Sequence, residues 1–295
     1  MRRTIREQQA ERQAAEHGRP ARAEPEIEEP ESLKPLGQEA PEIVDTGARI
    51  GARRLARPAL GDVVTAFIGG MSVSFGVVAM AWAASSLGAR EPGPSPGALV
   101  GALAFPIGFI ILLVGKSELF TENFFLPVSA VLERRGTFRQ LGALWAVSLA
   151  CNLLGGLVFA ALVSRPGVLA DAPARYIAAL AVHKAGSPFW AAFVQAIFAG
   201  WLMTLLTWLL VAAKGLGPRL AIIWGIGALI ILGEFNHVVI AACEAFIAML
   251  VGAPLTPAAW FVGNFLPALA GNVVGGVVFV TLLFYIQARY HEEGP

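Results

Sequence analysis

The chain has 295 residues, of which 56% are hydrophobic and 15% are charged, and its mean hydropathy is +0.64. This composition excludes an ordinary soluble enzyme and a disordered protein. Together with the 32 glycines, long uncharged stretches indicate one bundle of membrane helices. The net charge of +1 predicts no partner such as nucleic acid. Both cysteines, Cys151 and Cys243, lie in apolar segments and are interpreted as small core residues.

Residues 1–57 hold about half of the charged side chains, in balanced number. A charged stretch rich in helix formers is followed by a segment rich in Pro and Glu at 20–41, so we expect a largely disordered cytoplasmic tail. No apolar stretch follows the basic start, and no signal peptide is predicted. The tail precedes a predicted transport domain over residues 58–290.

Apolar stretches recur after the tail, and about 20 residues are needed for each helix that spans a membrane. An even number of spans places both termini on the same side. Basic residues gather at the ends of the stretches that share this side, and the positive-inside rule predicts that both termini are cytoplasmic in a multi-pass inner-membrane protein. The six predicted spans are 63–87, 98–132, 140–163, 188–212, 220–251 and 259–286.

The second and fifth stretches are too long for simple spans, and each contains polar residues near its middle. The interruptions lie at 115–123 and at 233–237. Unwound backbone at membrane depth survives only where it is buried in protein or lines a wet cavity. Two such interruptions indicate a permeation pathway.

The two halves of the chain also repeat. The pattern Asn-x-x-Gly-Gly occurs at 152–156 and again at 272–276, while Thr121 lies 116 positions before His237, so the two offsets nearly agree. Small residues also let helices pack closely, which explains the glycines but not the paired interruptions. Three spans per unit force the second unit to be inverted. We therefore predict an all-α integral membrane protein with six helices, an inverted 3+3 repeat and broken second and fifth helices.

His237 is the strongest candidate for a functional side chain, because an ionisable group in an apolar stretch is costly and histidine changes charge near neutral pH. The alternative is a neutral core histidine bonded to a carbonyl that the break frees. Thr121 offers a hydroxyl and precedes a half-helix that begins near Asn123. The N-terminus of this half-helix favours an anion. The alternative role of Thr121 is to cap the half-helix. The sequence assigns no role to Glu122 or Glu234.

Glu118 is interpreted as a structural carboxylate that holds the first interruption, with Lys116 as its partner and Gly115 and Gly233 supporting the two loops. Lys184 precedes the fourth span on the opposite face. A cation at a funnel mouth raises the local concentration of anions, but an ordinary interfacial lysine is the alternative. No metal site and no cofactor are predicted.

These motifs together resemble the formate/nitrite transporter family over residues 62–289. The residues that carry the resemblance are the Glu-Leu-Phe-Thr run at 118–121, the broken fifth span with His237, the segment 184–189 and the paired Asn-x-x-Gly-Gly sites. The resemblance implies an aquaporin-like protomer, a homopentamer with one pore per protomer, and passage of small monovalent anions or their acids, such as formate, nitrite, acetate, lactate or hydrosulfide.

By matching position, the resemblance implies roles for several side chains. His237 would be the central pore histidine, Thr121 the loop threonine opposite it, Lys184 the vestibule lysine and Leu119 part of the cytoplasmic-side constriction. Phe235 and Asn236 belong to the same pathway through the fifth-span motif.

The chain departs from the family pattern at several positions. It has Lys116 for a glycine, Asn236 for a glutamate, Ala241 for an asparagine and Gly200 for another asparagine, and Ser72 stands at the first-span constriction. It is similar to divergent inner-membrane members of the family, here with a long N-terminal tail. These departures leave open which anion is carried.

The leading hypothesis is therefore a transporter or channel for small monovalent weak-acid anions in the lipid bilayer, either passive or coupled to protons through His237. The runner-up is a non-conducting membrane scaffold or sensor on the same fold. A water or glycerol channel is disfavoured because neither broken span contains Asn-Pro-Ala. An enzyme is not predicted, since no nucleophile–base pair or metal-ligand cluster is present.

Overall fold

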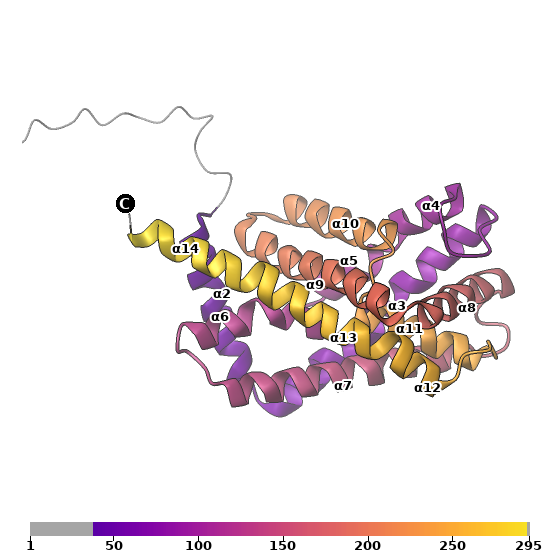
Figure 1. Ribbon diagram of the computed structural model, residues 1–295, viewed down its shortest axis with the longest axis horizontal. Helices are drawn as coiled ribbons and strands as arrows, with labels where there is room; N and C mark the ends of the chain where they lie inside the picture. Colours follow the sequence, from indigo (N-terminus) through magenta and orange to yellow (C-terminus); the bar gives the residue numbers. More distant parts are fainter. Residues whose placement is uncertain (1–37, 294–295) are drawn as a thin grey trace, which may run out of the picture. The chain divides into compact units, whose positions relative to one another are not determined.

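The computed structural model describes residues 38–293, and within them the chain forms helices joined by turns, with no strand (Figure 1). The helices are α2 Ala40–Leu55, α3 Ala59–Ser86, α4 Pro96–Ala104, α5 Ile107–Val114, the 3-10 helix η2 Phe120–Phe124, α6 Leu126–Leu132, α7 Phe138–Val163, α8 Asp171–Gly186, α9 Phe189–Ala212, α10 Leu216–Leu232, α11 Val238–Leu250, α12 Pro257–Trp260, the π-helix η3 Phe261–Phe265, α13 Leu266–Val273, the π-helix η4 Val274–Leu282 and α14 Leu283–Glu293. The predicted all-α class is confirmed.

Among the described residues, five continuous helical segments are long and apolar enough to cross a membrane: Ala59–Ser86, Pro96–Val114, Phe138–Val163, Phe189–Ala212 and Pro257–Tyr290. The other apolar helices are shorter. They are the continuous segment formed by η2 and α6, the helix α10, and the helix α11. The predicted stretches 98–132 and 220–251 therefore each contain two helical parts separated by non-helical backbone.

Side-chain caps fix where several of these helices begin. The hydroxyl of Ser95 accepts a hydrogen bond from Ala98 N ahead of α4. At the start of α7, Thr137 and Gln140 form a capping box in which each side chain binds the other's backbone N–H. Such caps satisfy N–H groups that have no partner inside the helix, and apolar runs alone do not mark these positions.

The two interrupted spans end their first halves in the same way. After α5, Ser117 N donates to the carbonyl of Leu112 at 3.1 Å, and after α10, Phe235 N donates to the carbonyl of Ile230 at 3.0 Å. The residues that precede these donors, Lys116 and Glu234, have φ of 63° and 51°. A left-handed residue turns the chain out of the helix and satisfies its last carbonyls, but a side chain there is strained.

Two asparagines hold the second halves in place. The amide nitrogen of Asn152 on α7 donates to the carbonyls of Ala66 at 2.7 Å and Glu118 at 2.9 Å, and its oxygen accepts from Phe120 N at 2.7 Å. The side chain thereby fastens both α3 and the first interruption to α7. A buried amide with all of these partners satisfied is a rigid tie.

Asn272 on α13 makes the equivalent bonds in the second half. Its amide nitrogen donates to the carbonyls of Ala196 at 2.8 Å and Asn236 at 2.9 Å, and its oxygen accepts from Val238 N at 2.9 Å. These matched bonds relate the two interruptions by 118 positions, from Glu118 to Asn236 and onward. Thr121 and His237 lie 116 positions apart, close to this offset.

Glycines allow the spans to touch at their backbones. A Cβ at Gly70 would lie 2.0 Å from the carbonyl oxygen of Asn152, and a Cβ at Gly200 would lie 2.1 Å from that of Asn272. No side chain fits at either position. Gly200 is thus explained by the contact between α9 and α13, rather than by the loss of a polar pore residue.

Helix α2 lies inside the segment that was expected to be a largely disordered tail. Residues 40–55 instead form a helix that packs beside α6 and α14 (Figure 1). Its amphipathic face buries Ile43 and Val44, and a Cβ at Gly51 would lie 1.9 Å from the carbonyl oxygen of Leu126. The physical reason is this close helix contact, which composition does not reveal. The tail prediction for residues 1–37 lies outside the described residues.

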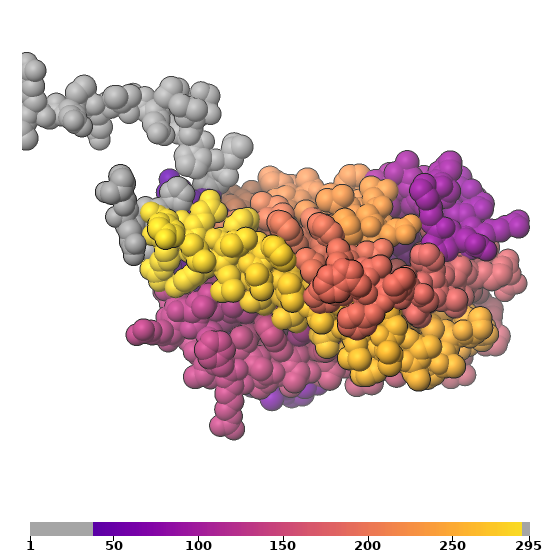
Figure 2. Space-filling view, in the orientation of Figure 1, coloured from indigo at the N-terminus to yellow at the C-terminus, as the bar shows by residue number. Residues whose placement is uncertain are grey.

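Two further features concern the ends and the surface of the bundle. Helix α8, which lies between two of the predicted spans, packs on α11 and buries Tyr176 and Ile177. It lies near α12, at the end away from α14 in Figure 1. The C-terminal helices run along the face seen in Figure 2. Val262, Val278 and Leu283 of these helices are exposed. Exposed apolar side chains along a spanning helix suit a lipid or protomer contact.

Candidate transport pathway

Thr121 and His237 meet in the interior of the protein. The Thr121 hydroxyl oxygen and His237 Nε2 are 2.9 Å apart, and the two residues are 0% and 1% exposed. Thr121 belongs to η2 in the first interruption, and His237 is the N-cap of α11 in the second. The structure therefore brings the two strongest sequence candidates into direct contact.

The other ring nitrogen of His237 identifies the tautomer. Nδ1 accepts a hydrogen bond from Ile240 N at 3.3 Å, as the cap of α11. A nitrogen that accepts carries no proton, so the neutral imidazole carries its proton on Nε2 and donates it to the Thr121 hydroxyl. Protonating the ring would break the cap.

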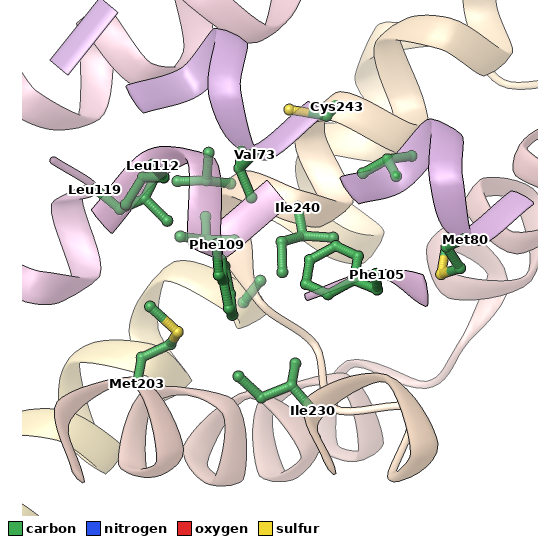
Figure 3. Close-up of a cluster of buried hydrophobic side chains, with 14 of the residues drawn as sticks. Val73, Met80, Phe105, Phe109, Leu112, Leu119, Met203, Ile230, Ile240 and Cys243 are labelled. Atoms are coloured by element: carbon green, nitrogen blue, oxygen red, sulfur yellow. The ribbon is translucent and has the colours of Figure 1, made fainter. Parts of the chain in front are cut away.

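Apolar side chains surround this contact. Phe109, Leu112 and Leu119 are each 0% exposed, and Figure 3 shows them grouped close to Val73. The ring centroids of Phe109 and His237 are 6.5 Å apart. A charged solute in such surroundings loses its water shell without replacement, which costs several kcal/mol or more.

A cavity of about 250 Å³, named here the Lys184 cavity, lies toward one end of α9 and α10. Its polar walls come from the N-cap of α4, from α8 with its C-cap, from α9, from the second interruption and from α11: Ser95, Tyr176, His183, Lys184, Ser187, Gln195, Glu234 and Glu244. Phe235 also lines it, and stacks on Phe198 with ring centroids 5.2 Å apart. Neither Thr121 nor His237 lines this cavity.

Lys184 does not stand alone in this cavity. Its ammonium donates to Glu244 Oε2 at 2.6 Å, and Glu244 on α11 is 1% exposed. Sequence reasoning missed Glu244, although a carboxylate inside an apolar stretch, seven residues after His237, is a signal of the kind that singled out the histidine. Lys184, expected as a cation at a funnel mouth, is thus one half of an ion pair.

A second cavity of about 530 Å³, named here the Arg57 cavity, lies toward the other end of α9 and α10. Its charged walls come from α2, the turn between α2 and α3, the first interruption and α10: Arg54, Arg57, Lys116, Glu118, Glu122 and Arg219. Neither Thr121 nor His237 lines it either. The first interruption thus lines the Arg57 cavity, the second lines the Lys184 cavity, and the Thr121–His237 contact joins the two interruptions.

The partner of Glu118 differs from the expected one. Glu118 Oε1 accepts from Arg57 Nη2 at 2.6 Å and lies 3.2 Å from Arg54 Nε. Lys116 is exposed and makes no ion pair among the described residues. An arginine fork suits a carboxylate better than a lysine at this spacing. Hydrogen bonding to Glu118 also raises the pKa of the Arg57 guanidinium.

Arg54 binds the first interruption at two more points. Its Nη1 donates to Asn123 Oδ1 at 2.8 Å, and its Nη2 lies 3.8 Å from Glu122 Oε2. Glu122 in turn accepts from Leu119 N at 2.9 Å through Oε1. The interruption is therefore held by α2, and the arginines expected to mark only the cytoplasmic face act as structural partners.

The remaining candidates support the interruptions. Asn236 is 1% exposed and accepts from Asn264 Nδ2 at 3.2 Å, and it lines neither cavity. A Cβ at Gly115 would lie 2.4 Å from the carbonyl oxygen of Ile111, and one at Gly233 would lie 2.4 Å from the Phe235 ring. Within residues 38–293, no group of three or more His, Cys, Asp or Glu is placed to hold a metal ion.

Long apolar helices, two interrupted spans and a polar cavity at each end of α9 and α10 define a polytopic membrane transport protein. Residues 41–286 match the sequence profile of the family described as formate/nitrite transporter. The chain belongs to the formate/nitrite transporter family. Members of this family are transporters and channels rather than enzymes, in agreement with the sequence prediction.

Relatives and solved structures agree with this assignment. The chain is 30% identical over 257 residues to the uncharacterized transporter YrhG of Bacillus subtilis, covering 85% of this chain and 93% of that protein. It is 27% identical over 246 residues to the inner membrane protein YfdC of Escherichia coli, covering 81% and 76%. An FNT family ion channel superposes with a TM-score of 0.75 at 22% identity, covering 83% of this chain and 98% of that one.

A second solved structure, a pentameric formate channel with formate bound, superposes with a TM-score of 0.67 at 22% identity. The match covers 78% of this chain and 97% of that one. At this identity the likeness supports the fold.

Proposed function

We propose that this chain carries small monovalent weak-acid anions, of the formate and nitrite class, through the contact between Thr121 and His237. The observation that carries the proposal is this buried hydrogen bond, because it joins the two interruptions, each of which lines one of the two cavities. A solute that passes replaces Thr121 as the acceptor of the His237 Nε2–H. Transport of this class is supported at the level of the family.

The proposed pathway has an apolar constriction on either side of the histidine. Leu119 and Phe109 lie on the side of the Arg57 cavity in the proposal, and Phe235 on the side of the Lys184 cavity. A bare anion pays a large solvation penalty there, which its protonated form avoids. Because Nδ1 of His237 is occupied, we propose that the substrate's proton travels with it and that the imidazole stays a neutral donor.

We also propose that the two halves form an inverted 3+3 repeat with broken second and fifth helices. The matched bonds of Asn152 and Asn272 and the shared helix endings support this. Three spans per half place Asn152 and Asn272 in opposite orientations in the membrane. Each asparagine then holds the interruption of its own half, in the opposite orientation to the other.

The assembly and orientation are proposals as well. A homopentamer with one pathway per protomer is supported by the pentameric formate channel that shares the fold. Cytoplasmic termini in an inner membrane are supported by three arginines that line the Arg57 cavity, Arg54, Arg57 and Arg219. The Arg57 cavity is then cytoplasmic and the Lys184 cavity external.

Reconstitution of the full chain into liposomes tests the proposed function. Formate and nitrite flux should exceed that of empty vesicles and rise as the pH falls, because more substrate is protonated. Absence of flux for formate, nitrite and acetate would overturn the proposal and favour a non-conducting scaffold or sensor. Deletion of residues 1–37 is then compared with the pathway variants in cells. Loss of the cellular phenotype on deletion, with no effect of the pathway variants, would favour the scaffold or sensor.

Variants at the contact test the pathway itself. Thr121→Val removes the acceptor of the Nε2–H, and His237→Ala removes the donor, and each should lower flux at least about tenfold. Ser148→Ala is the matched control, because this buried serine bonds only the carbonyl of Trp145 in its own helix. Unchanged flux in His237→Ala would remove the histidine from the pathway while leaving the fold assignment intact.

A further inference from the structure

Lys184 and Glu244 form a nearly enclosed pair of opposite charge. The ammonium and the carboxylate oxygen are 2.6 Å apart, and the two side chains are 17% and 1% exposed. The pair joins α8 to α11 at the wall of the Lys184 cavity. Because the charges cancel, the pair gives the cavity no net attraction for an anion.

The pair lines this cavity and retains unused hydrogen-bonding capacity. Glu244 Oε1 is buried and has no hydrogen-bond partner among the described residues. An ammonium has three N–H donors. Among the described residues, Lys184 uses one of them, in its bond to Glu244 Oε2. A free acceptor and free donors therefore lie side by side, which is a costly arrangement unless a ligand or water uses it.

The location of the pair relates it to the pathway. Glu244 lies on α11 seven residues after His237, the N-cap of that helix, which places the two residues about 10 Å apart along the helix axis. A solute that enters the Lys184 cavity meets the pair before the histidine. The pair is thus placed to select what reaches the Thr121–His237 contact.

We propose that the Lys184–Glu244 pair recognises the neutral, protonated form of the weak acid, an inference that rests on the proposed function. The acid O–H donates to Glu244 Oε1, and the acid's second oxygen accepts from the Lys184 ammonium. The geometry offers one acceptor beside one donor, which matches the two oxygens of a carboxylic or nitrous acid. Glu244 is then a specificity-determining residue.

A bare anion is disfavoured by the same groups. It has only acceptors, so it cannot satisfy Glu244 Oε1, and the carboxylate repels it. The other titratable side chains on the cavity wall are Tyr176, His183 and Glu234, and Lys184 is the one lysine or arginine among the described residues that line it. Lys184 therefore acts as half of a recognition pair rather than as an electrostatic funnel.

Competition by a permanently ionised anion tests this inference. Formate uptake is measured at one fixed pH in cells that express the full chain, with external thiocyanate as the competitor. Wild type should be inhibited weakly. Glu244→Gln leaves the ammonium unneutralised, so the thiocyanate concentration for half-inhibition should fall about tenfold. Unchanged inhibition in a variant that still takes up formate would overturn the inference.

A matched control lies in the same cavity. Glu234→Gln removes the same charge from the wall but leaves the Lys184–Glu244 pair intact, so its half-inhibition should change less than about twofold. An equal effect of both variants would overturn the specific role of Glu244, because general cavity charge would then explain it.

A second variant decides the matter if Glu244→Gln does not reach the membrane. Lys184→Met combined with Glu244→Leu replaces the buried pair by apolar groups of similar size, which proteins tolerate well. The KM for formate should rise about tenfold because both proposed bonds are lost, and an unchanged KM would overturn the inference. Wild type that carries no formate instead contradicts the proposed function, so the two failures are distinguishable.

Discussion

Asn152 and Asn272 make the same three hydrogen bonds in the two halves of the protein, at distances of 2.7 to 2.9 Å. Each amide joins a spanning helix to both sides of an interruption. The residues between the bonded groups are Leu119 in one half and His237 in the other. The position of His237 therefore depends on the Asn272 amide, which bonds the backbone on either side of it.

Removing either amide should destabilise the protein strongly. Asn152→Ala or Asn272→Ala leaves one backbone N–H and two carbonyls without this partner, and each should cost about 2–4 kcal/mol in the free energy of unfolding. Thermal unfolding in detergent measures the loss. Ser148→Ala should cost less than about 1 kcal/mol. Equal losses of unfolding free energy in all three variants would contradict the stabilising role of the two asparagines.

The overall fold was largely predictable because its physical signals are local. Apolar stretches of sufficient length located the spans, and polar residues at 115–123 and 233–237 located both interruptions. Helix α2 was not predicted, because its stability comes from contact with α6 and α14, and its own composition is polar. Helix α8 was missed for the same reason, since it packs on α11.

Arg54 should be essential for the first interruption. Arg54→Gln leaves Glu118 with one fewer cation and removes the cation that pairs with the buried Glu122 carboxylate. Such a loss costs about 3–5 kcal/mol when the remaining charge stays buried. Arg53→Gln is the matched control on the same helix, and its exposed side chain predicts a change within about 0.5 kcal/mol.

Denaturant or thermal unfolding of both variants checks this. The double variant Arg54→Gln with Glu122→Gln should recover part of the loss, because the Glu122 carboxylate is then no longer left without its cation. A double variant less stable than Arg54→Gln alone would contradict the ion-pair explanation.

The candidate site was predictable only where one residue carried the signal. His237 and Thr121 were found because each interrupts an apolar stretch, and the structure places them in contact. The partners of charged residues were not found. Sequence proximity suggested Lys116 for Glu118, whereas the actual partner Arg57 lies 61 residues away on another element. Long-range pairing depends on the packed fold, which spacing along the chain does not encode.

Substitution of the tight glycines should separate the spans. Gly200→Ala places a methyl group 2.1 Å from the carbonyl oxygen of Asn272, and Gly51→Ala places one 1.9 Å from that of Leu126. Each should cost at least about 1–3 kcal/mol in the free energy of unfolding. Gly225→Ala in α10 is the control, because nothing lies within 4 Å of its Cβ position. It should be neutral or stabilising by up to about 1 kcal/mol.

The anchoring of α2 should weaken in acid. Asp45 accepts hydrogen bonds from Arg135, at 2.7 Å, and from Arg49, and these bonds lower the pKa of its carboxyl below the ordinary 3.8. A lowered folded-state pKa means that the stabilisation is complete above the ordinary value and is lost as the pH falls through the lowered pKa. Because the side chains are partly exposed, the contribution at neutral pH is below about 1 kcal/mol and shrinks with salt.

Hydrogen exchange of the α2 backbone measures this contribution directly. Asp45→Asn should speed exchange in α2 severalfold at neutral pH, and the difference from wild type should vanish in strong acid, where Asp45 is protonated in both states. Asp171→Asn provides the control, since Asp171 pairs with Arg175 within α8, a different helix. A difference that persists undiminished in strong acid would contradict the electrostatic explanation, because a neutral carboxyl and an amide carry the same charge.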